Sequence, residues 1–380
     1  MAVGQSDDVD PRIAVAQAIE QCREQMGDRS PNAGILFCAV DSFQPVLVSR
    51  VRDAFPGINL IGATSAAEVS STAGYLEDSV ALALFATDNI AVGVGLATGL
   101  DREISANTRA ALDEALGGIT TPVRLCIVLA DPNVAQLVAE TLNSMLPGAL
   151  VVGGGAGRNE LGASGAPTYQ FCNERIETYS AAILVLAGDL AVSTAVGTGW
   201  TVLGPSGVVT RSAFGVIERI DDRPAAEFLR GYIDVSSGSA PGNPLALRDP
   251  GSDDWYLRVV LRSDSEGRLF IPGGVSVGAT VQLTTTNPQQ MLAATADAVD
   301  RARAAFPADA VPAAALIFSC AVRKYLLGTR SGHEVAAARA GLPAALPIAG
   351  MYCMGEIAPT GTAANSHFLN ETFVTLLMGT

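Results

Sequence analysis

A block of sequence that occurs three times constrains the fold more than any other feature of this chain. In the first copy an apolar strand at 34–40 leads into a helix rich in Val and Leu, and a short strand follows it. The second copy repeats the order strand, helix, strand. The separation from Gly57 to Gly62 in the first copy equals that from Gly148 to Gly153 in the second. Equal spacing of turn glycines around the same elements predicts duplicated α/β units.

Each of these two copies continues with a pair of strands that a two-residue turn joins. The pairs are 80–86 with 90–96 in the first copy and 182–187 with 190–196 in the second. Their alternating hydrophobicity around short Asx- and Gly-containing turns is typical of β-hairpins.

A third copy closes the chain, after a stretch of different character. It has a strand at 315–319, and Glu356 follows Gly350 at the distance at which Glu68 follows Gly62. We therefore predict an α/β protein in which repeated β-α-β-β units form mixed sheets covered by helices.

Two domains are expected. Residues 1–30 form a polar segment and a helix, and residues 31–235 form an N-terminal domain of two repeated units plus a spacer. Residues 236–380 form a C-terminal domain that carries the third unit, and a Gly- and Ser-rich stretch at 236–243 is the candidate linker.

Composition narrows the class of protein. The longest apolar runs, 181–187 and 313–318, are far shorter than the roughly 20 residues that span a bilayer, and no signal peptide opens the chain. A net charge of −14 disfavours nucleic acid and anionic membranes as partners. The six cysteines form no C-x-x-C pair, which suits buried thiols in a reducing compartment. We expect a soluble cytoplasmic protein.

Several short stretches, in order along residues 34–378, together resemble the FIST family of sensory domains. These are Gly62-Ala63-Thr64-Ser65-Ala66-Ala67-Glu68, Gly199-Trp200, Gly204-Pro205, Val209-Thr210, Asp222-Arg223-Pro224-Ala225, Asn243-Pro244-Leu245, Leu316-Ile317-Phe318-Ser319-Cys320-Ala321-Val322-Arg323, Gly350-Met351-Tyr352-Cys353-Met354-Gly355-Glu356-Ile357 and His367-Phe368-Leu369-Asn370-Glu371-Thr372. One departure is Ala67, where the family's pattern more often has Gly.

The resemblance implies a small-molecule-binding sensor of signal transduction with an N-terminal and a C-terminal FIST part. It implies a polar metabolite such as an amino acid as the ligand, and it leaves open a haem-based nitric-oxide sensor. No kinase, cyclase or F-box segment is recognisable, so we expect the output to pass in trans to a partner such as a histidine kinase. The sequence leaves oligomerisation open.

Polar residues of the third unit follow the ends of its predicted strands, where ligands usually bind in α/β sheets. The set comprises Ser319, Cys320, Arg323, Gly350, Tyr352, Glu356, His367 and Asn370. Arg323 is suited to clamp a carboxylate and Glu356 to receive an amine, while His367 and Asn370 offer directional hydrogen bonds. The alternative is a structural Arg–Glu ion pair with Asn370 as a cap.

The matching loop of the first unit offers Thr64, Ser65 and Glu68, as pocket residues or as turn formers. The glycine run at 153–157 lacks the G-x-G-x-x-G register and a following helix, so it does not predict a dinucleotide site.

Metal and catalytic alternatives rest on few residues. The chain has two histidines, His333 and His367, and His333-Glu334 lacks the second histidine of a zinc-protease helix. His367 or a cysteine is able to serve as a haem ligand, but aromatic residues make up only 6% of the chain. Cys320 with His367 is the one nucleophile–base pair worth naming. Without an orienting third group, we expect a binding protein and no enzyme.

Overall fold

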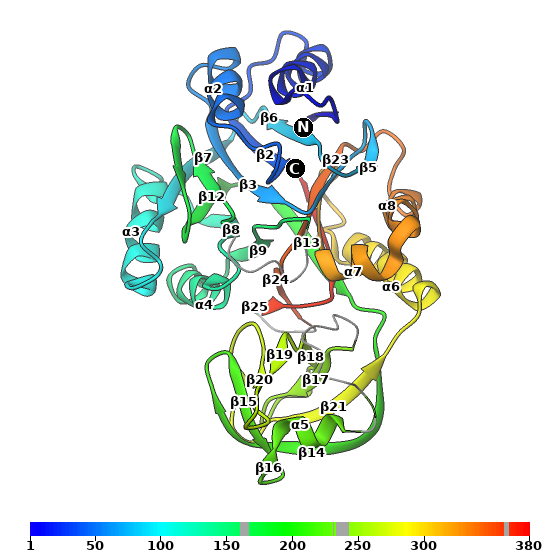
Figure 1. Ribbon diagram of the computed structural model, residues 1–380. Coiled ribbons are helices and arrows are strands. Elements are labelled where there is room, and N and C mark those ends of the chain that lie inside the picture. Colours follow the sequence, from blue (N-terminus) through cyan, green and yellow to red (C-terminus); the bar gives the residue numbers. More distant parts are fainter. Residues whose placement is uncertain (160–166, 231, 233–242, 361–364) are drawn as a thin grey trace.

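Three six-stranded mixed sheets, one for each predicted repeat, form the larger part of the molecule (Figure 1). The computed structural model describes residues 1–159, 167–230, 232, 243–360 and 365–380. Each sheet has at its centre one parallel pair of strands joined by helix: β2 with β3, β8 with β9, and β22 with β23. The predicted repeated α/β units are confirmed.

The strand order of the first sheet is β1 (Ala2–Ser6), β6 (Val80–Phe85), β2 (Ala33–Ala39), β3 (Asn59–Ser65), β10 (Gln170–Cys172) and β11 (Arg175–Glu177). The second sheet has β25 (Ser366–Leu369), β24 (Glu356–Pro359), β9 (Leu150–Gly155), β8 (Val123–Ala130), β12 (Ala181–Gly188) and β7 (Ile90–Ala97). The third has β13 (Ala191–Gly197), β26 (Phe373–Gly379), β22 (Pro312–Cys320), β23 (Ile348–Cys353), β4 (Ala67–Ser70) and β5 (Gly74–Leu76).

Each unit lends strands to its neighbours, so the three sheets are interlocked. The strand after each parallel pair leaves its own sheet: β4 joins the third sheet, β10 the first and β24 the second. The strand after each return strand also crosses over, as β7 pairs with β12 and β13 with β26. The two predicted β-hairpins were therefore wrong: β6 and β7 lie in different sheets, and so do β12 and β13. The N-terminal β1 completes the pattern by pairing with β6. In the first sheet β1 therefore takes the edge position that β7 takes in the second sheet and β13 in the third, which completes a three-fold cycle.

The loops at the centre of this cycle form a closed ring of backbone hydrogen bonds. The N–H of Ala66 donates to Tyr352 O at 2.8 Å, that of Gly157 to Thr64 O at 2.7 Å and that of Met354 to Gly155 O at 2.9 Å. Each bond joins a different pair of units. The glycine run of the second unit is needed here, since a Cβ on Gly157 would lie 2.7 Å from Ala66 N.

Pairs of helices cover the outer faces of the sheets (Figure 1). They are α1 (Pro11–Met26) with α2 (Pro45–Ala54), α3 (Ile104–Leu116) with α4 (Ala135–Met145), and α6 (Pro288–Ala305) with α8 (Ser331–Ala340), α7 (Ala321–Leu327) and a 3-10 turn (Gly328–Arg330). Helix α6 is capped by Asn287, whose side chain accepts from Gln290 N at 2.9 Å. The inner faces of all three sheets share one apolar core, which includes Ile35, Ile127 and Leu316.

A fourth sheet lies outside the cycle and, with one short helix, forms a second body with its own core (Figure 1). Its order is β18 (Tyr256–Arg258), β17 (Leu245–Arg248), β21 (Thr280–Thr285), β14 (Thr201–Ala213), β15 (Val216–Ile220), β20 (Leu269–Phe270) and β19 (Arg262–Ser263), with β16 (Arg223–Pro224) on β15 and helix α5 (Ala225–Leu229). We call residues 201–285 the inserted body and the rest the core body.

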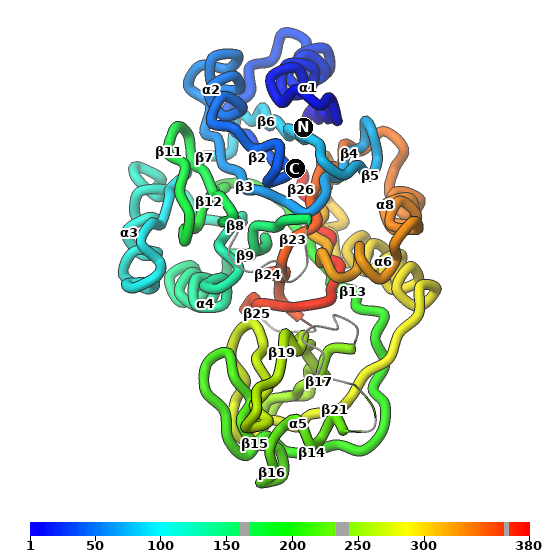
Figure 2. The backbone as a smooth tube through the Cα atoms, viewed as in Figure 1, coloured from blue at the N-terminus to red at the C-terminus, as the bar shows by residue number. Residues whose placement is uncertain are grey.

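Two adjacent connections join the bodies (Figure 2). One runs from β13 to β14 through Gly199, and the other runs from β21 to α6 through Thr286, whose hydroxyl donates to Gly199 O at 2.6 Å. These two bodies have other bounds than the two domains expected from the sequence, 31–235 and 236–380. The third unit belongs to the core body, and the inserted body interrupts the chain between the second and third units. Apart from residue 243, the linker predicted at 236–243 lies outside the described residues.

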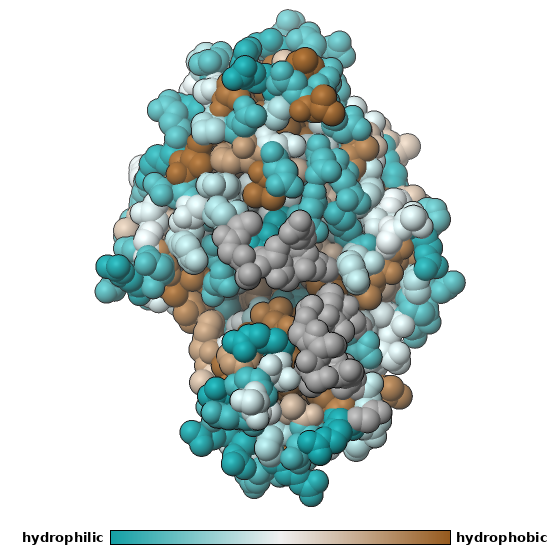
Figure 3. Space-filling model, in the orientation of Figure 1, coloured by the Kyte–Doolittle hydropathy of each residue, from teal (hydrophilic) through white to brown (hydrophobic). Residues whose placement is uncertain are grey.

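Among the residues that the structure describes, no helix has both the length and the apolar character needed to cross a membrane. On the face shown in Figure 3, hydrophobic residues occur in small separate groups among hydrophilic ones.

Candidate functional site

Arg323 belongs to a buried network centred on Glu334. The guanidinium donates to Glu334 Oε1 from Nε at 3.0 Å and from Nη2 at 2.7 Å, and neither side chain has exposed area. Ser319 and Tyr352 donate their hydroxyls to Glu334 Oε2 at 2.7 and 2.8 Å. Arg323 thus forms a structural ion pair, but its partner is Glu334 of α8 and not Glu356, the partner that the predicted alternative implied.

The same guanidinium also holds the connection between the bodies. Nη1 of Arg323 donates to Thr198 O at 2.5 Å, beside Gly199, and Nη2 donates to Met291 O in the first turn of α6 at 3.1 Å. Arg323 therefore ties both connections to the core body, and in this arrangement no part of it is open to a ligand.

Glu356 has equivalents in the other two units. In each unit junction an acidic or amide side chain lies opposite the residue after the repeated glycine of another unit. Glu356 lies opposite the residue after Gly153, Glu68 opposite the residue after Gly350, and Gln170 opposite the residue after Gly62. Each accepts a hydroxyl and a backbone N–H from the residue before the return strand: Thr372 at 2.6 and 3.1 Å, Ser79 at 2.6 and 3.1 Å, and Ser180 at 2.7 and 3.3 Å. This set is a repeated structural lock at the unit junctions.

The carboxyls in these locks are far from water. Burial raises the pKa of Glu68 to about 7 and that of Glu356 to about 8, although hydrogen bonds oppose both shifts. Thr64, Ser65 and Glu68 are all fully buried, and the Ser65 hydroxyl donates to Glu68. Two roles were predicted for these three residues, pocket residues or turn formers, and their hydrogen bonds fit the second, structural role.

Cys320 lies among buried acids and not beside a base. It is 3% exposed, and burial raises the pKa of its thiol well above the usual range. Burial likewise raises the pKa of Glu371 to about 8. Neither carboxyl oxygen of Glu371 has a hydrogen-bond partner among the described residues, and the indole of Trp200 lies near it outside hydrogen-bond geometry. No hydrogen bond joins Cys320 to His367 in the described chain, and burial disfavours the thiolate that a nucleophile needs.

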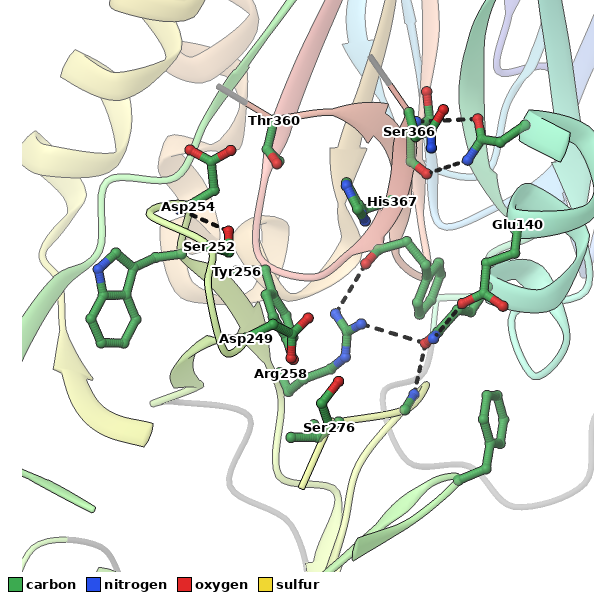
Figure 4. Close-up of a pocket in the computed structure, with 18 of the residues that line it drawn as sticks. Glu140, Asp249, Ser252, Asp254, Tyr256, Arg258, Ser276, Thr360, Ser366 and His367 are labelled. Atoms are coloured by element: carbon green, nitrogen blue, oxygen red, sulfur yellow. Dashed lines mark hydrogen bonds between the residues drawn. The ribbon is translucent and has the colours of Figure 1, made fainter. Parts of the chain in front are cut away.

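A cleft of about 750 Å³ lies between the two bodies, and it is the candidate ligand site (Figure 4). The core body contributes one side of α4, including Gln136 and Glu140, and the strand β25 with His367. The inserted body contributes the β14–β15 turn, residues 274–276, and the side chains of Asp249, Ser252, Asp254, Trp255, Tyr256 and Arg258. This volume is within the range of small-molecule sites, roughly 300–1,000 Å³.

Arg258 forms the floor of the cleft and bridges the two bodies. It is 4% exposed and donates to Phe368 O at 3.0 Å and to Gln136 Oε1 at 3.5 Å, while its guanidinium lies 4.7 Å from the ring centre of Tyr256. Burial lowers the pKa of Arg258 to about 10, so it stays charged at neutral pH. Its Nε has no acceptor among the described residues.

The predicted site residues thus fall into separate places. His367 is exposed and lines the cleft. Asn370 lies beside the cleft and accepts from Val259 N of the inserted body at 3.4 Å, so it bridges the bodies where a cap was predicted. Arg323 and Glu356 are enclosed in the core body, so Arg323, Glu356 and His367 do not share one pocket as the sequence suggested. Gly350 is required for packing, because a Cβ there would lie 2.2 Å from Ile317 O.

Sequence reasoning missed Glu334, Arg258 and the aromatic residues Trp255 and Tyr256. Glu334 was considered only for a metal motif, and its spacing from Arg323 across α7 and α8 gives no signal by itself. For the cleft a weak signal existed, since Asp254-Trp255-Tyr256 combines charge and aromatic rings in a loop. No group of three His, Cys, Asp or Glu within the described ranges is arranged to hold a metal ion.

Comparison with known families gives two adjoining matches. The FIST N domain matches residues 32–223 and the FIST C domain matches residues 225–359. The boundary between them falls within the inserted body, directly before α5. Among curated proteins, none matches this chain.

Two solved structures show a weak likeness to part of this chain. One is a cyanuric acid hydrolase, described as an evolutionary innovation by structural concatenation, with 9% identity and a TM-score of 0.29; the match covers 52% of this chain and 71% of that one. Another is cyanuric acid hydrolase from A. caulinodans, with 14% identity, a TM-score of 0.27 and the same coverage. At these scores the likeness supports no argument about chemistry.

Proposed function

The chain belongs to the FIST family, and from this premise we propose that it senses a small polar molecule that binds in the cleft between its core and inserted bodies. FIST domains are associated with sensory signal transduction and the binding of small ligands. The observation that carries the proposal is the cleft itself, whose walls come from both bodies. A ligand that touches both walls stabilises one relative placement of the bodies, because it binds that placement better than others.

The connections between the bodies support this mechanism. Both connections pass over the network of Arg323 and Glu334, so a shift of the inserted body acts on Gly199 and on the start of α6. Gly199 adopts a φ of +76°, a conformation that favours glycine, and it is the natural hinge position. We propose that the altered placement is read in trans by a cytoplasmic signalling protein such as a histidine kinase.

The cleft is poorly suited to haem, the alternative that the resemblance left open. His367 lines it and has the chemistry of an axial ligand. However, Glu140, Asp249 and Asp254 also line it, and they would oppose the two haem propionates. Within the described part of the lining the only arginine is Arg258, and it already donates to protein acceptors. A colourless protein after haem supplementation, without a Soret band, is the expected result.

An enzymatic role is not part of the proposal. The nucleophile–base pair considered from the sequence consists of Cys320, a buried thiol among acids, and His367, which lines the cleft. Cys320→Ala is therefore expected to leave ligand binding unchanged.

The proposal is tested by blocking the cleft. Ser276 is exposed on its wall, whereas the next residue, Val277, is 58% exposed and lies outside the lining. A thermal-shift screen of polar metabolites is expected to find molecules that stabilise the wild type and the Val277→Trp control but not Ser276→Trp, since a ligand stabilises the state it binds. Equal stabilisation of both variants by every hit would place the ligand elsewhere and contradict the proposal.

A further inference from the structure

We infer that the cleft selects an organic cation, a molecule with an ammonium or guanidinium group, a neutral hydrogen-bond acceptor and no carboxylate or phosphate. This inference rests on the proposed function, because it specifies the class of ligand for the same cleft.

The first argument is the charge of the lining. Glu140, Asp249 and Asp254 line the cleft, and none of them forms an ion pair with a cation in the described part of the chain. Among the lining residues that the structure describes, one arginine, Arg258, stands against these three carboxylates. A cation lowers the net negative charge of this lining, a zwitterion leaves it unchanged and an anion increases it. Partly enclosed charges interact more strongly than charges in bulk water, so we expect the cation to bind most tightly, then the zwitterion, and the anion most weakly.

The carboxylates retain accepting capacity. Asp249 Oδ1 accepts from the Tyr256 hydroxyl at 3.1 Å, and Glu140 Oε1 accepts from Gln136 Nε2 at 2.9 Å. In each case the second oxygen accepts no hydrogen bond from the described residues, and Asp254 accepts none there with either oxygen. Figure 4 shows Asp249 and Asp254 on the inserted-body side of the cleft and Glu140 on the other side. An ammonium group therefore finds acceptors on both walls.

The second argument is independent of the acids and concerns Arg258. Its Nη1 donates to Leu257 O and Phe368 O, and its Nη2 donates to Gln136 Oε1. Arg258 therefore neutralises no carboxylate by direct contact. Its Nε–H is buried at the floor of the cleft without an acceptor in the described residues, and leaving a buried donor unsatisfied is unfavourable. A hydroxyl or carbonyl oxygen of the ligand would satisfy it. A carboxylate there would also face the net negative lining.

Aromatic rings supply the third argument. Phe214 lines the cleft and is 51% exposed, and Trp255 and Tyr256 stand beside the acids. The faces of two of these rings already hold cations, with Arg248 5.0 Å from the Trp255 ring centre and Arg258 4.7 Å from that of Tyr256. Aromatic faces near carboxylates are the usual surroundings of bound organic cations.

Three probes that share one skeleton test the inference: tyramine as the cation, tyrosine as the zwitterion and 3-(4-hydroxyphenyl)propionate as the anion. Isothermal titration of the full chain at low salt is expected to show tyramine binding at least about ten-fold more tightly than tyrosine, with the anion weakest. Asp254→Asn is expected to weaken tyramine about ten-fold, whereas Asp253→Asn, at the exposed neighbour outside the lining, should change it less than about two-fold.

Equal or tighter binding of tyrosine or the anion would overturn the inference. So would an unaltered tyramine affinity in Asp254→Asn, or no binding of tyramine at millimolar concentration. Ser276→Trp separates this failure from that of the proposed function. If metabolites without a positive charge stabilise the wild type but not Ser276→Trp, the cleft is the sensor site and only the choice of ligand class is wrong.

Discussion

Removal of the Glu334 carboxylate is expected to cost this protein about 3–5 kcal/mol of unfolding free energy, the range for breaking one partner of a buried ion pair. In Glu334→Ala, Arg323 keeps its charge with no exposed area and loses two hydrogen bonds, at 2.7 and 3.0 Å. The hydroxyls of Ser319 and Tyr352 lose their acceptor as well. Each lost neutral bond is worth about 1 kcal/mol, so the stranded charge dominates.

Two further variants separate charge from shape. Glu334→Gln keeps an acceptor oxygen, so it should cost less than Glu334→Ala. Replacement of both charges, in Arg323→Met with Glu334→Met, removes the stranded cation and should also cost less than Glu334→Ala, since buried pairs are often replaceable by apolar residues. An exposed pair on α6 supplies the control: Asp297 and Arg301 are 64% and 51% exposed, and Asp297→Ala should cost less than about 1 kcal/mol.

Urea unfolding followed by circular dichroism measures these differences, with calorimetry as a second probe. At about 2–4 °C per kcal/mol, the scale for domains of 150–250 residues, a loss of about 3–5 kcal/mol lowers Tm by roughly 6–20 °C. A Glu334→Ala variant within about 1 kcal/mol of the wild type would refute the reasoning, because that is the range of an exposed pair. A double variant less stable than Glu334→Ala would refute it too.

Three further predictions concern packing, pH and thiols. Gly350→Ala should destabilise by several kcal/mol because its Cβ would lie 2.2 Å from a backbone oxygen, whereas Gly332→Ala on α8, where a Cβ meets nothing within 4 Å, should be neutral or stabilising in thermal unfolding. The pKa of Glu371 is raised to about 8 in the folded protein from about 4.3 in the unfolded chain, so the protonated carboxyl contributes stability below about pH 4, and this stability is lost as pH rises to about 8. The Tm of the wild type should therefore fall across this pH window. Glu371→Gln should be more stable than the wild type at alkaline pH and similar to it at pH 5. A disulfide reagent at neutral pH should titrate none of the six buried cysteines quickly in the native state and all six after denaturation; rapid labelling of Cys320 would contradict its burial.

The repeated units could be predicted because their cause is local. Gly62, Gly153 and Gly350 sit where a neighbouring strand's backbone leaves no room for a Cβ, with contacts of 2.2, 1.8 and 2.2 Å, so the same residue recurs at the same spacing. The equivalence of Glu68 and Glu356 was visible for a related reason, because both follow the glycine at the same distance. In the second unit the equivalent residue is Gln170, and a longer loop conceals it from a comparison by spacing.

The exchange of strands between units could not be predicted. It depends on pairings between distant segments, such as β1 with β6 and β10 with β3, and period-2 patterning does not specify which neighbour a strand joins. The same limit hid the partner of Arg323, because only the turn of the chain between α7 and α8 brings Glu334 to it. The cleft is assembled from α4, β25 and loops of the inserted body, and His367 was the one lining residue that strand-end reasoning found.

A crystal structure of gently purified protein that still carries a molecule in native mass spectrometry tests the central claim most directly. We predict that this molecule lies between α4 and β25 on one side and residues 249–258 on the other, in contact with both bodies. A molecule bound within the core body, beside Arg323 and Glu356, or on one body alone would contradict the account.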